Sequence, residues 1–228
     1  MNFVNYKYYI WVIQELCDGK TIYDYMKTGY TNIVRNNGKK ILRTMLKVLE
    51  HLRDNNIIHC DIKDENIMIQ INGEEIVSLK LLDFGLSFWK KSIRTDYIQG
   101  SPYYLAPETL TYKTYNIDIS VWAVFVLYFY IISNVYPFHG RNIKEIVNNI
   151  LNRLPYQWMN PDITRKDLAI LYLKNIFFND VIHVLTMLEK NPADRYSLEQ
   201  LIYPEGHNAL GGRPAKSSWL NWERGTIG

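Results

Sequence analysis

The residues best suited to chemistry in this chain lie in one short stretch, HCDIKDENIMI, from His59 to Ile69. A carboxylate at Asp61, an ammonium at Lys63 and a carboxamide at Asn66 stand close together, and an apolar run follows them. A carboxylate can accept a proton, an ammonium can neutralise a phosphate, and an amide oxygen can bind Mg²⁺. The stretch is therefore compatible with phosphoryl transfer, although a polar loop between two core elements would have the same composition.

Further motifs follow this loop along the chain. LLDFGLS places Asp83 at the end of a predicted strand, GSPYYLAPE ends at Glu108, and NPADRYS contains Arg195 near the C-terminus. Taken singly, each has an ordinary explanation: Lys63 as a surface cation, Asn66 as a turn former, Asp83 as a cap at the strand end. The joint occurrence of the motifs in this order favours a catalytic explanation.

The hydrophobic pattern predicts the elements that position these motifs. One or two strands are expected in KYYIWVIQEL, a short helix in DGKTIYDYM, and two more strands in NIMIQI and VSLKLLDF around an NGEE turn. An amphipathic helix is expected over 39–53, and the pattern becomes helical from Thr109 onward. Later helices are expected near 121–132, 145–151, 166–178, 180–188 and 198–202. Strands followed by a helical body indicate an α+β protein.

The composition favours a globular chain. Of the 228 residues, 47% are hydrophobic and 21% are charged, and the scattered net charge of +3 gives no reason to expect nucleic-acid binding. The strongest membrane candidate, VWAVFVLYFYII, is shorter than the roughly 20 apolar residues that a span needs. Cys17 and Cys60 are the only cysteines, and no secretory signal is evident, so we expect a reducing, cytoplasmic location.

The motifs together resemble those of the eukaryotic-type protein kinases, of the serine/threonine type, which read His-Arg-Asp…Asn, Asp-Phe-Gly, Ala-Pro-Glu and a late Arg. The resemblance covers about residues 8–202. It implies a protein-kinase-like α+β fold that is mainly the helical C-terminal lobe, at 19–204. Residues 1–18 would be remnant small-lobe strands and the hinge. Residues 205–228 would form a disordered tail, unless Trp219 and Trp222 make it a docking peptide.

The resemblance also implies an activity, the transfer of phosphate from ATP with Mg²⁺ to a protein substrate. Asp61 would orient the attacking hydroxyl, Lys63 would face the γ-phosphate, and Asn66 and Asp83 would bind the metal ion. Lys63, together with Ser101 on the substrate platform, favours serine and threonine over tyrosine as the acceptor. The segment from Asp-Phe-Gly to Ala-Pro-Glu favours a protein acceptor over a lipid or a sugar.

The remaining site residues receive their roles from the same resemblance. Backbone groups of Glu15 and Cys17 would bind adenine, Gln14 would guard the back of that pocket, and Met68 would lie beneath the ring. Met68 can also be a simple core-strand residue, and the two descriptions are compatible.

Four further residues are structural by the same resemblance. His59 and Phe84 would stack in the core, and Glu108 and Arg195 would form a buried ion pair.

Two departures from the family pattern bear on activity. The Gly-rich loop and the small-lobe Lys that pairs with the α/β-phosphates are missing, so we expect this chain alone to bind ATP weakly and to turn over poorly or not at all. It would then be a fragment, a degenerate copy or half of a split protein. Cys60 replaces the Arg of His-Arg-Asp, so we expect that phosphorylation at Ser92, Thr95 or Tyr97 does not switch activity.

A third departure concerns support for the loop. Ser120 stands where the family carries an Asp that braces the catalytic loop, and a serine can make one neutral hydrogen bond there. Asp118 lies ~200° around a helix from that position and cannot substitute. A looser loop is expected. The alternative to an enzyme is thus a pseudokinase-like binding or regulatory module.

Overall fold

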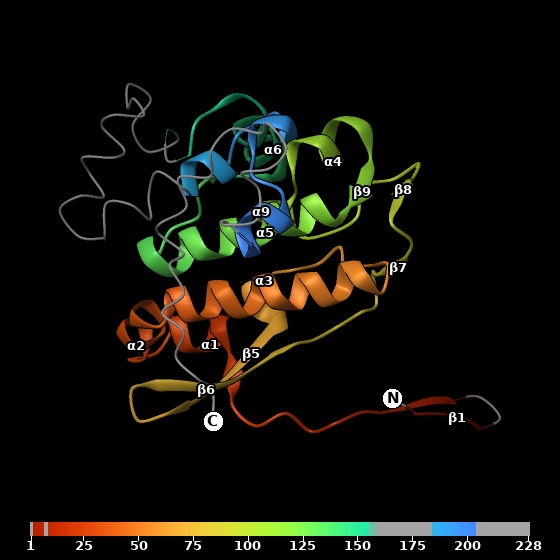
Figure 1. Cartoon of the computed structure of the whole chain (residues 1–228), viewed down its shortest axis with the longest axis vertical. Coiled ribbons are helices and arrows are strands. Elements are labelled where there is room, and N and C mark those ends of the chain that lie inside the picture. Colours follow the sequence, from red (N-terminus) through yellow and green to blue (C-terminus); the bar gives the residue numbers. More distant parts are fainter. Residues whose placement is uncertain (1, 7–8, 156, 158–183, 204–228) are drawn as a thin grey trace.

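A computed structural model describes residues 2–6, 9–155, 157 and 184–203 of the chain (Figure 1). The strands are β1 (Asn2–Tyr6), β2 (Tyr9–Ile13), β3 (Lys20–Thr21), β4 (Ile57–Ile58), β5 (Ile67–Asn72), β6 (Glu75–Leu81), β7 (Phe88–Trp89), β8 (Ser92–Arg94) and β9 (Thr114–Asn116). The α-helices are α1 (Ile22–Met26), α2 (Thr31–Asn36), α3 (Gly38–Asp54), α4 (Pro107–Tyr112), α5 (Ile117–Ser133), α6 (Ile143–Asn152) and α9 (Leu198–Ile202). Short 3₁₀ turns are η1 (Asp64–Asn66), η2 (Pro102–Tyr104) and η3 (Pro192–Asp194).

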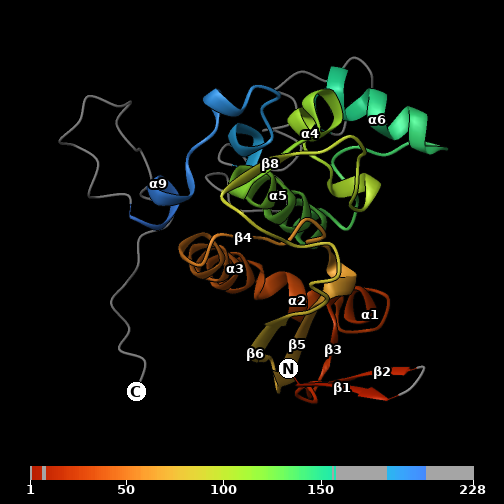
Figure 2. The same cartoon turned by 90° about the vertical axis from the view of Figure 1, so that its right-hand side faces the viewer.

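The two long helices α3 and α5 lie side by side at the centre of the molecule, with β5 and β6 on the outer side of α3 (Figure 1). Helices α4 and α6 lie on the opposite side, beyond α5. Helix α9 lies beside α3 and α5 and packs against both (Figure 2). The sheet of β3, β5 and β6 thus lies on one side of a mainly helical body, while the short pairs β4–β7 and β8–β9 lie elsewhere along it.

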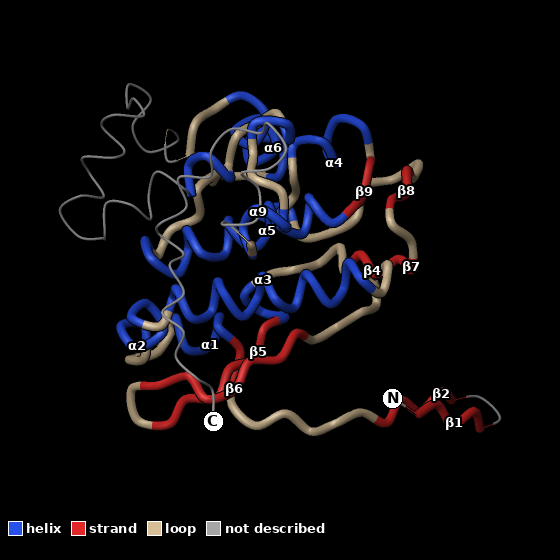
Figure 3. Tube along the Cα trace, in the orientation of Figure 1, coloured by secondary structure: helices blue, strands red, loops and turns tan. Residues whose placement is uncertain are grey.

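The strands form small antiparallel sheets rather than one large sheet (Figure 3). Strand β5 is central in the three-stranded order β3-β5-β6, and the β5–β6 hairpin matches the two strands predicted around the NGEE turn. Strands β1 and β2 pair in a separate hairpin. Only β2 lies within the predicted segment KYYIWVIQEL, because β1 precedes it.

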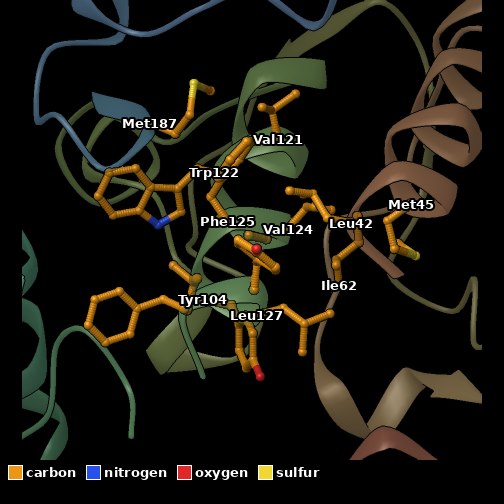
Figure 4. Close-up of a cluster of buried hydrophobic side chains, with 14 of the residues drawn as sticks. Leu42, Met45, Ile62, Tyr104, Val121, Trp122, Val124, Phe125, Leu127 and Met187 are labelled. Atoms are coloured by element: carbon orange, nitrogen blue, oxygen red, sulfur yellow. The ribbon is translucent and has the colours of Figure 1, made fainter. Parts of the chain in front are cut away.

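Helix α3 is amphipathic, as its sequence period predicts, and extends the predicted range 39–53 by one residue at each end. Its buried face carries Ile41, Leu42, Met45, Leu46, Leu49 and Leu52. These apolar side chains lie at i, i+3 and i+4 spacing, which puts them on one stripe of the helix. Leu42 of this stripe points toward Val124 of α5 in the core (Figure 4). Burial of the stripe, rather than helix propensity alone, therefore holds α3 in place.

Helix α5 is apolar on all sides because protein surrounds it. Asn116 caps its first turn by accepting a hydrogen bond from the amide of Asp118 at 3.1 Å, and Asn134 ends it in a left-handed conformation with φ 62°. Among the described residues, no helix is long and apolar enough to cross a membrane. The predicted helices at 145–151 and 198–202 are present as α6 and α9, and the described part of 180–188 is helical at 184–187, whereas 166–178 and 180–183 lie outside the described residues.

Ser120, on α5, does not make the hydrogen bond expected from the sequence. The residue is 2% exposed, yet its hydroxyl oxygen has no hydrogen-bond partner among the described residues. A cavity of about 20 Å³, lined by Ser120, Cys60 and Asp61 among others, separates α5 from the loop above it. This space has room for about one water molecule.

A ring stack joins α5 to the C-terminal segment. The guanidinium carbon of Arg195 lies 4.6 Å from the centre of the Trp122 ring, and Trp122 lies parallel to Phe138 with ring centres 5.7 Å apart. The Lys190 ammonium nitrogen is 3.7 Å from the centre of the Phe138 ring. That nitrogen is buried and has no hydrogen-bond partner among the residues described. Burial, and secondarily the charge of Arg195, lowers the pKa of Lys190 to about 7.

Replacing Ser120 with alanine is expected to leave the free energy of unfolding unchanged or to raise it by up to about 1 kcal/mol, because no protein hydrogen bond is lost. Ser133→Ala on the same helix is the matched control. The Ser133 hydroxyl donates to the Phe129 carbonyl at 2.6 Å, so its removal should cost about 1 kcal/mol. Urea unfolding measures both. A Ser120→Ala loss as large as that of Ser133→Ala would show that the Ser120 hydroxyl is bonded in solution.

The free energy of unfolding is expected to rise between pH 7 and pH 9, by up to about 1 kcal/mol per pH unit. Lys190 is neutral in the folded chain above its pKa of about 7, but regains a proton on unfolding until the pH approaches its ordinary value of 10.5. The unfolded state therefore binds more protons in this window, and raising the pH favours the folded state. Lys190→Met should flatten the dependence, whereas Lys144→Met, at an exposed position of α6, should not. Equal slopes in all three proteins would contradict this assignment.

Candidate functional site

The loop that carries Asp61 is shaped by an unusual backbone conformation. It follows strand β4, and Cys60 takes φ 67°, in the left-handed region that residues other than glycine seldom adopt. Turn η1 then brings Asn66 back toward Asp61 before strand β5 begins at Ile67. The loop is thereby folded on itself, so residues that are five apart in the sequence meet.

Asp61 is the centre of a compact hydrogen-bond network. Its Oδ1 accepts a hydrogen bond from the Ser101 hydroxyl at 2.8 Å, and its Oδ2 lies 2.8 Å from the Lys63 ammonium. The Asn66 amide nitrogen donates to Oδ2 at 3.0 Å and to the Asp61 carbonyl at 2.9 Å. Lys63 also lies 3.1 Å from the Ser101 hydroxyl. The structure thus brings Asp61, Lys63, Asn66 and Ser101 into one cluster.

The electrostatics of the cluster keep both charges in place. Burial of Asp61 works against ionisation, but hydrogen bonds from Lys63, Ser101 and Asn66 outweigh it and hold the pKa of Asp61 below its usual value. Burial likewise works against the charge of Lys63, and contact with Asp61 nevertheless raises the pKa of Lys63. The pair is therefore an ionised carboxylate next to an ionised ammonium near neutral pH.

Asp83 lies next to this network but is not hydrogen-bonded to it. It is exposed, takes φ 58°, and accepts a hydrogen bond from the Gly85 amide at 3.0 Å. The neighbouring Leu82 connects it to the loop, because the Leu82 amide donates to the Asn66 carbonyl at 2.8 Å. The Leu82 carbonyl accepts from His59 Nε2 at 2.9 Å. A carboxylate is thus held at the edge of the loop by the backbone beside it.

His59 is a buried, neutral connector between the two segments. Its Nε2 donates to Leu82, which leaves Nδ1 to accept a hydrogen bond from the Asp61 amide at 3.3 Å. Burial lowers the pKa of His59, which agrees with the neutral ring that this pattern requires. The ring meets Phe84 edge to face, with centres 4.7 Å apart. Phe84 itself is 45% exposed, so the expectation that it lies in the core is wrong: His59 covers one part of the ring and solvent reaches another.

The protein supplies only part of the oxygen ligands that a magnesium ion needs. Because the Asn66 nitrogen is committed to Asp61, its amide oxygen is left to face a ligand. Asp83 keeps a carboxylate oxygen beyond the one bonded to Gly85. Among the described residues there is no group of three or more His, Cys, Asp or Glu residues that could hold a metal ion. A Mg²⁺ ion held by the Asn66 amide and the Asp83 carboxylate would therefore need phosphate or water oxygens for the rest of its ligands.

The expected nucleotide-binding residues lie on the strand side of the molecule. Met68 is half-buried on β5, on the face opposite the buried Ile67 and Ile69. Glu15 and Cys17 follow strand β2, and the Glu15 carboxylate pairs with Lys80 of β6. Gln14, expected to guard the back of the pocket, is exposed here. No contact joins these hinge residues to Asp61 in the part of the chain that is described.

The buried ion pair implied by the resemblance is present. Arg195 Nη1 and Nη2 lie 2.7 and 2.9 Å from the two carboxylate oxygens of Glu108, in a bidentate arrangement. Arg195 also donates to the Glu189 carbonyl at 2.8 Å. The pair fixes the start of α4 to the C-terminal segment, and breaking one partner of such a pair typically costs about 3–5 kcal/mol.

The loop contains a second buried carboxylate, Asp64, which the sequence motifs did not single out. Asp64 Oδ1 accepts from the Tyr104 hydroxyl at 3.0 Å, and its Oδ2 accepts from the Tyr136 hydroxyl at 3.3 Å. Burial raises the pKa of Asp64 in spite of these bonds. The sequence does show an acid at this position, between Lys63 and Asn66. Its hydrogen-bond partners could not be read from the local pattern, because they lie 40 and 72 residues away. Asp64 ties the loop to the segment that contains Ser101.

Comparison with known proteins agrees with the geometry of the Asp61 loop. The protein kinase domain family matches residues 1–204. A "Probable serine/threonine-protein kinase 2" of Plasmodium falciparum is 30% identical over 200 residues, which are 85% of this chain and 36% of that protein. "Serine/threonine-protein kinase DCLK3" of Mus musculus is 30% identical over 196 residues, 85% of this chain and 23% of that protein.

A plant relative gives the same picture. "Calcium-dependent protein kinase 21" of Oryza sativa subsp. japonica is 31% identical over 194 residues, 84% of this chain and 32% of that protein. The chain thus spans about a third or less of the length of these relatives. The loop of Asp61 is folded around one ionised carboxylate, and the family model matches most of the length of this chain. The chain therefore belongs to the protein kinase domain family.

Proposed function

We propose that this chain provides the phosphoryl-transfer loop of a serine/threonine protein kinase that uses ATP and Mg²⁺. The observation that carries the proposal is the ionised, buried Asp61, held by Lys63, Ser101 and Asn66. A buried carboxylate is costly unless it is paired and bonded, so a structure that keeps it ionised has positioned a proton acceptor. The match to the kinase family supports the same proposal.

Asp61 retains the capacity to accept one further proton donor. An ionised carboxylate has about four acceptor sites. Ser101 uses one on Oδ1, while Lys63 and Asn66 use those on Oδ2. The free site on Oδ1 is where the hydroxyl of a substrate serine or threonine would bind. As that hydroxyl attacks phosphorus, Asp61 would accept its proton.

One of the contacts of Lys63, the one with Glu65, is weak enough to be exchanged for a phosphate oxygen. Its ammonium carries three donors, directed at Asp61, Ser101 and Glu65. The Glu65 contact is the longest, at 3.5 Å, and the Glu65 side chain is exposed. An incoming phosphate oxygen would displace Glu65 without disturbing the Asp61 pair. Bound Mg²⁺, held by Asn66 and Asp83, would neutralise phosphate charge.

The identity of the acceptor rests on the sequence and on the family. Lys63 and the Ser101 hydroxyl, both bonded to Asp61, support serine or threonine, and the segment up to Glu108 supports a protein acceptor. Glu15, Cys17 and Met68 are proposed to line the adenine site. The two free thiols support a reducing, cytoplasmic location.

A binding or regulatory module is the second candidate function. Ser120 makes no hydrogen bond to the loop in the described part of the chain. This feature favours a chain that binds nucleotide or a partner without efficient turnover. Nucleotide binding and turnover therefore have to be measured separately.

ATP with Mg²⁺ is expected to raise the melting temperature of the chain, because a ligand that binds only the folded state stabilises it. Asp83→Asn should remove the Mg²⁺-dependent part of the shift and leave the part seen with ATP in EDTA. Asp54→Asn, at the exposed end of α3, serves as the control. No shift with millimolar ATP and Mg²⁺ would argue against nucleotide binding by this chain.

Asp61→Asn is expected to lower phosphate transfer to a protein acceptor by about 10²–10⁴-fold, the usual contribution of a general base. The amide keeps the size of the carboxylate but cannot take the proton. The measurement is transfer of labelled phosphate from ATP to casein, with circular dichroism to verify folding. If the parent chain shows an ATP-dependent thermal shift but no transfer above the Asp61→Asn background, the binding-module function replaces the enzymatic one.

A further inference from the structure

The segment between Asp83 and Ser101 is anchored at several points along its length. Strand β7 pairs with β4, placing Phe88 opposite Ile58, and strand β8 pairs with β9, placing Ile93 opposite Tyr115. Each ladder is only two or three residues long. Such short ladders fray readily, so the segment needs a more central attachment to keep its last residues in place.

Tyr115 supplies that attachment with its hydroxyl group. The Gln99 amide donates to the Tyr115 oxygen at 2.7 Å, and the Tyr115 hydroxyl donates to the Gln99 carbonyl at 3.2 Å. One buried hydroxyl therefore satisfies both backbone groups of Gln99. The ring is 0% exposed and packs edge to face on Phe88, with ring centres 5.8 Å apart. Its position is thus fixed by packing rather than by the bonds it makes.

The residues after Gln99 transmit this position to the site. Gly100 takes φ 112° and passes so close to the loop that a Cβ there would lie 2.8 Å from the Cys60 carbonyl oxygen. Only glycine fits this approach. The next residue is Ser101, whose hydroxyl is 2.8 Å from Asp61 Oδ1. The attachment at Gln99 lies two residues from a direct contact with the proton acceptor.

Gln99 also connects the two ends of the segment. Its side-chain nitrogen donates to the Leu86 carbonyl at 2.9 Å, close to the start of the segment. The other attachments lie farther out and are more exposed. The Thr95 amide bonds to the Lys113 carbonyl at 3.1 Å, and the Lys113 ammonium bonds to the Asp96 carbonyl. Gln99 is therefore the inner attachment point, and Tyr115 is what holds its backbone.

We propose that Tyr115 is a positioning residue whose hydroxyl holds Gln99 so that Ser101 stays bonded to Asp61. The importance of Asp61 rests on the function proposed above, but the hold on Gln99 does not. A phosphate group can order a segment of this kind by its charge. Here the Tyr115 hydroxyl orders the segment by bonding to backbone groups, without any modification. Cys60 contributes no cation at this place, because a thiol cannot carry a positive charge, and burial raises its pKa to about 11, which keeps it neutral.

Hydrogen exchange measured by mass spectrometry on the whole chain tests this inference. Tyr115→Phe keeps the ring packed on Phe88 but removes both bonds to Gln99, so exchange in peptides covering 97–101 is expected to accelerate about tenfold. Tyr112→Phe is the matched control, because the Tyr112 ring is exposed on α4. Loss of the Tyr112 hydroxyl should leave exchange at 97–101 unchanged. Exchange in α3 distinguishes a local release from general destabilisation, and should not change in either variant.

Turnover gives the second readout. With casein as acceptor, Tyr115→Phe should lower kcat about tenfold and leave the KM for ATP unchanged, because the hinge residues are not attached to Gln99. Faster exchange at 97–101 supports the inference even if the parent chain transfers no phosphate, an outcome that would count against the proposed function alone. Unchanged exchange at 97–101, or an equal increase throughout α3, would overturn the positioning role of Tyr115.

Discussion

The structure depends on keeping one carboxylate ionised inside the protein. Asp61 is buried, and a buried charge is tolerated only when ion pairing and hydrogen bonds replace the water it has lost. The replacements come from Lys63 and Asn66 in the same loop and from Ser101 in a distant segment. The fold must therefore hold two separate pieces of chain together with an accuracy of tenths of an ångström, and most of the surrounding contacts serve that requirement.

That accuracy comes from a rigid helical base and from polar links above it. Helices α3 and α5 pack through a continuous apolar core, and Arg195 joins this core by lying on the Trp122 ring while it pairs with Glu108. Above the core, Tyr104 and Tyr136 bind Asp64, and His59 connects Asp61 to Leu82. Each link has one member in the loop and one outside it, so displacement of the loop would break several bonds together.

The support of the loop is uneven. One side of the loop is bonded through Ser101, Lys63 and Asn66, whereas its other side faces a small cavity in which the Ser120 hydroxyl has no protein partner among the described residues. The chain thus retains the groups that define the charge of the site while the group beneath the loop contributes no bond. The two features are compatible. The charge of Asp61 is stabilised by its own bonded partners, and α5 is held by packing against its apolar neighbours.

The local elements and the identity of the charged groups follow from the amino-acid sequence alone. Helix α3 and the β5–β6 hairpin follow from periods of 3.6 and 2 residues, and Asp61, Lys63 and Asn66 stand within six residues of one another in one predicted loop. Among the contacts between remote segments, the family resemblance implied the place of Ser101 beside Asp61 and the pair of Glu108 with Arg195. Only the folded chain shows that Tyr115 bonds to Gln99, that Phe84 remains 45% exposed and that the Ser120 hydroxyl has no partner among the described residues. A hydrogen bond is made or lost within about 0.5 Å, and no local pattern fixes the separation of two segments that closely.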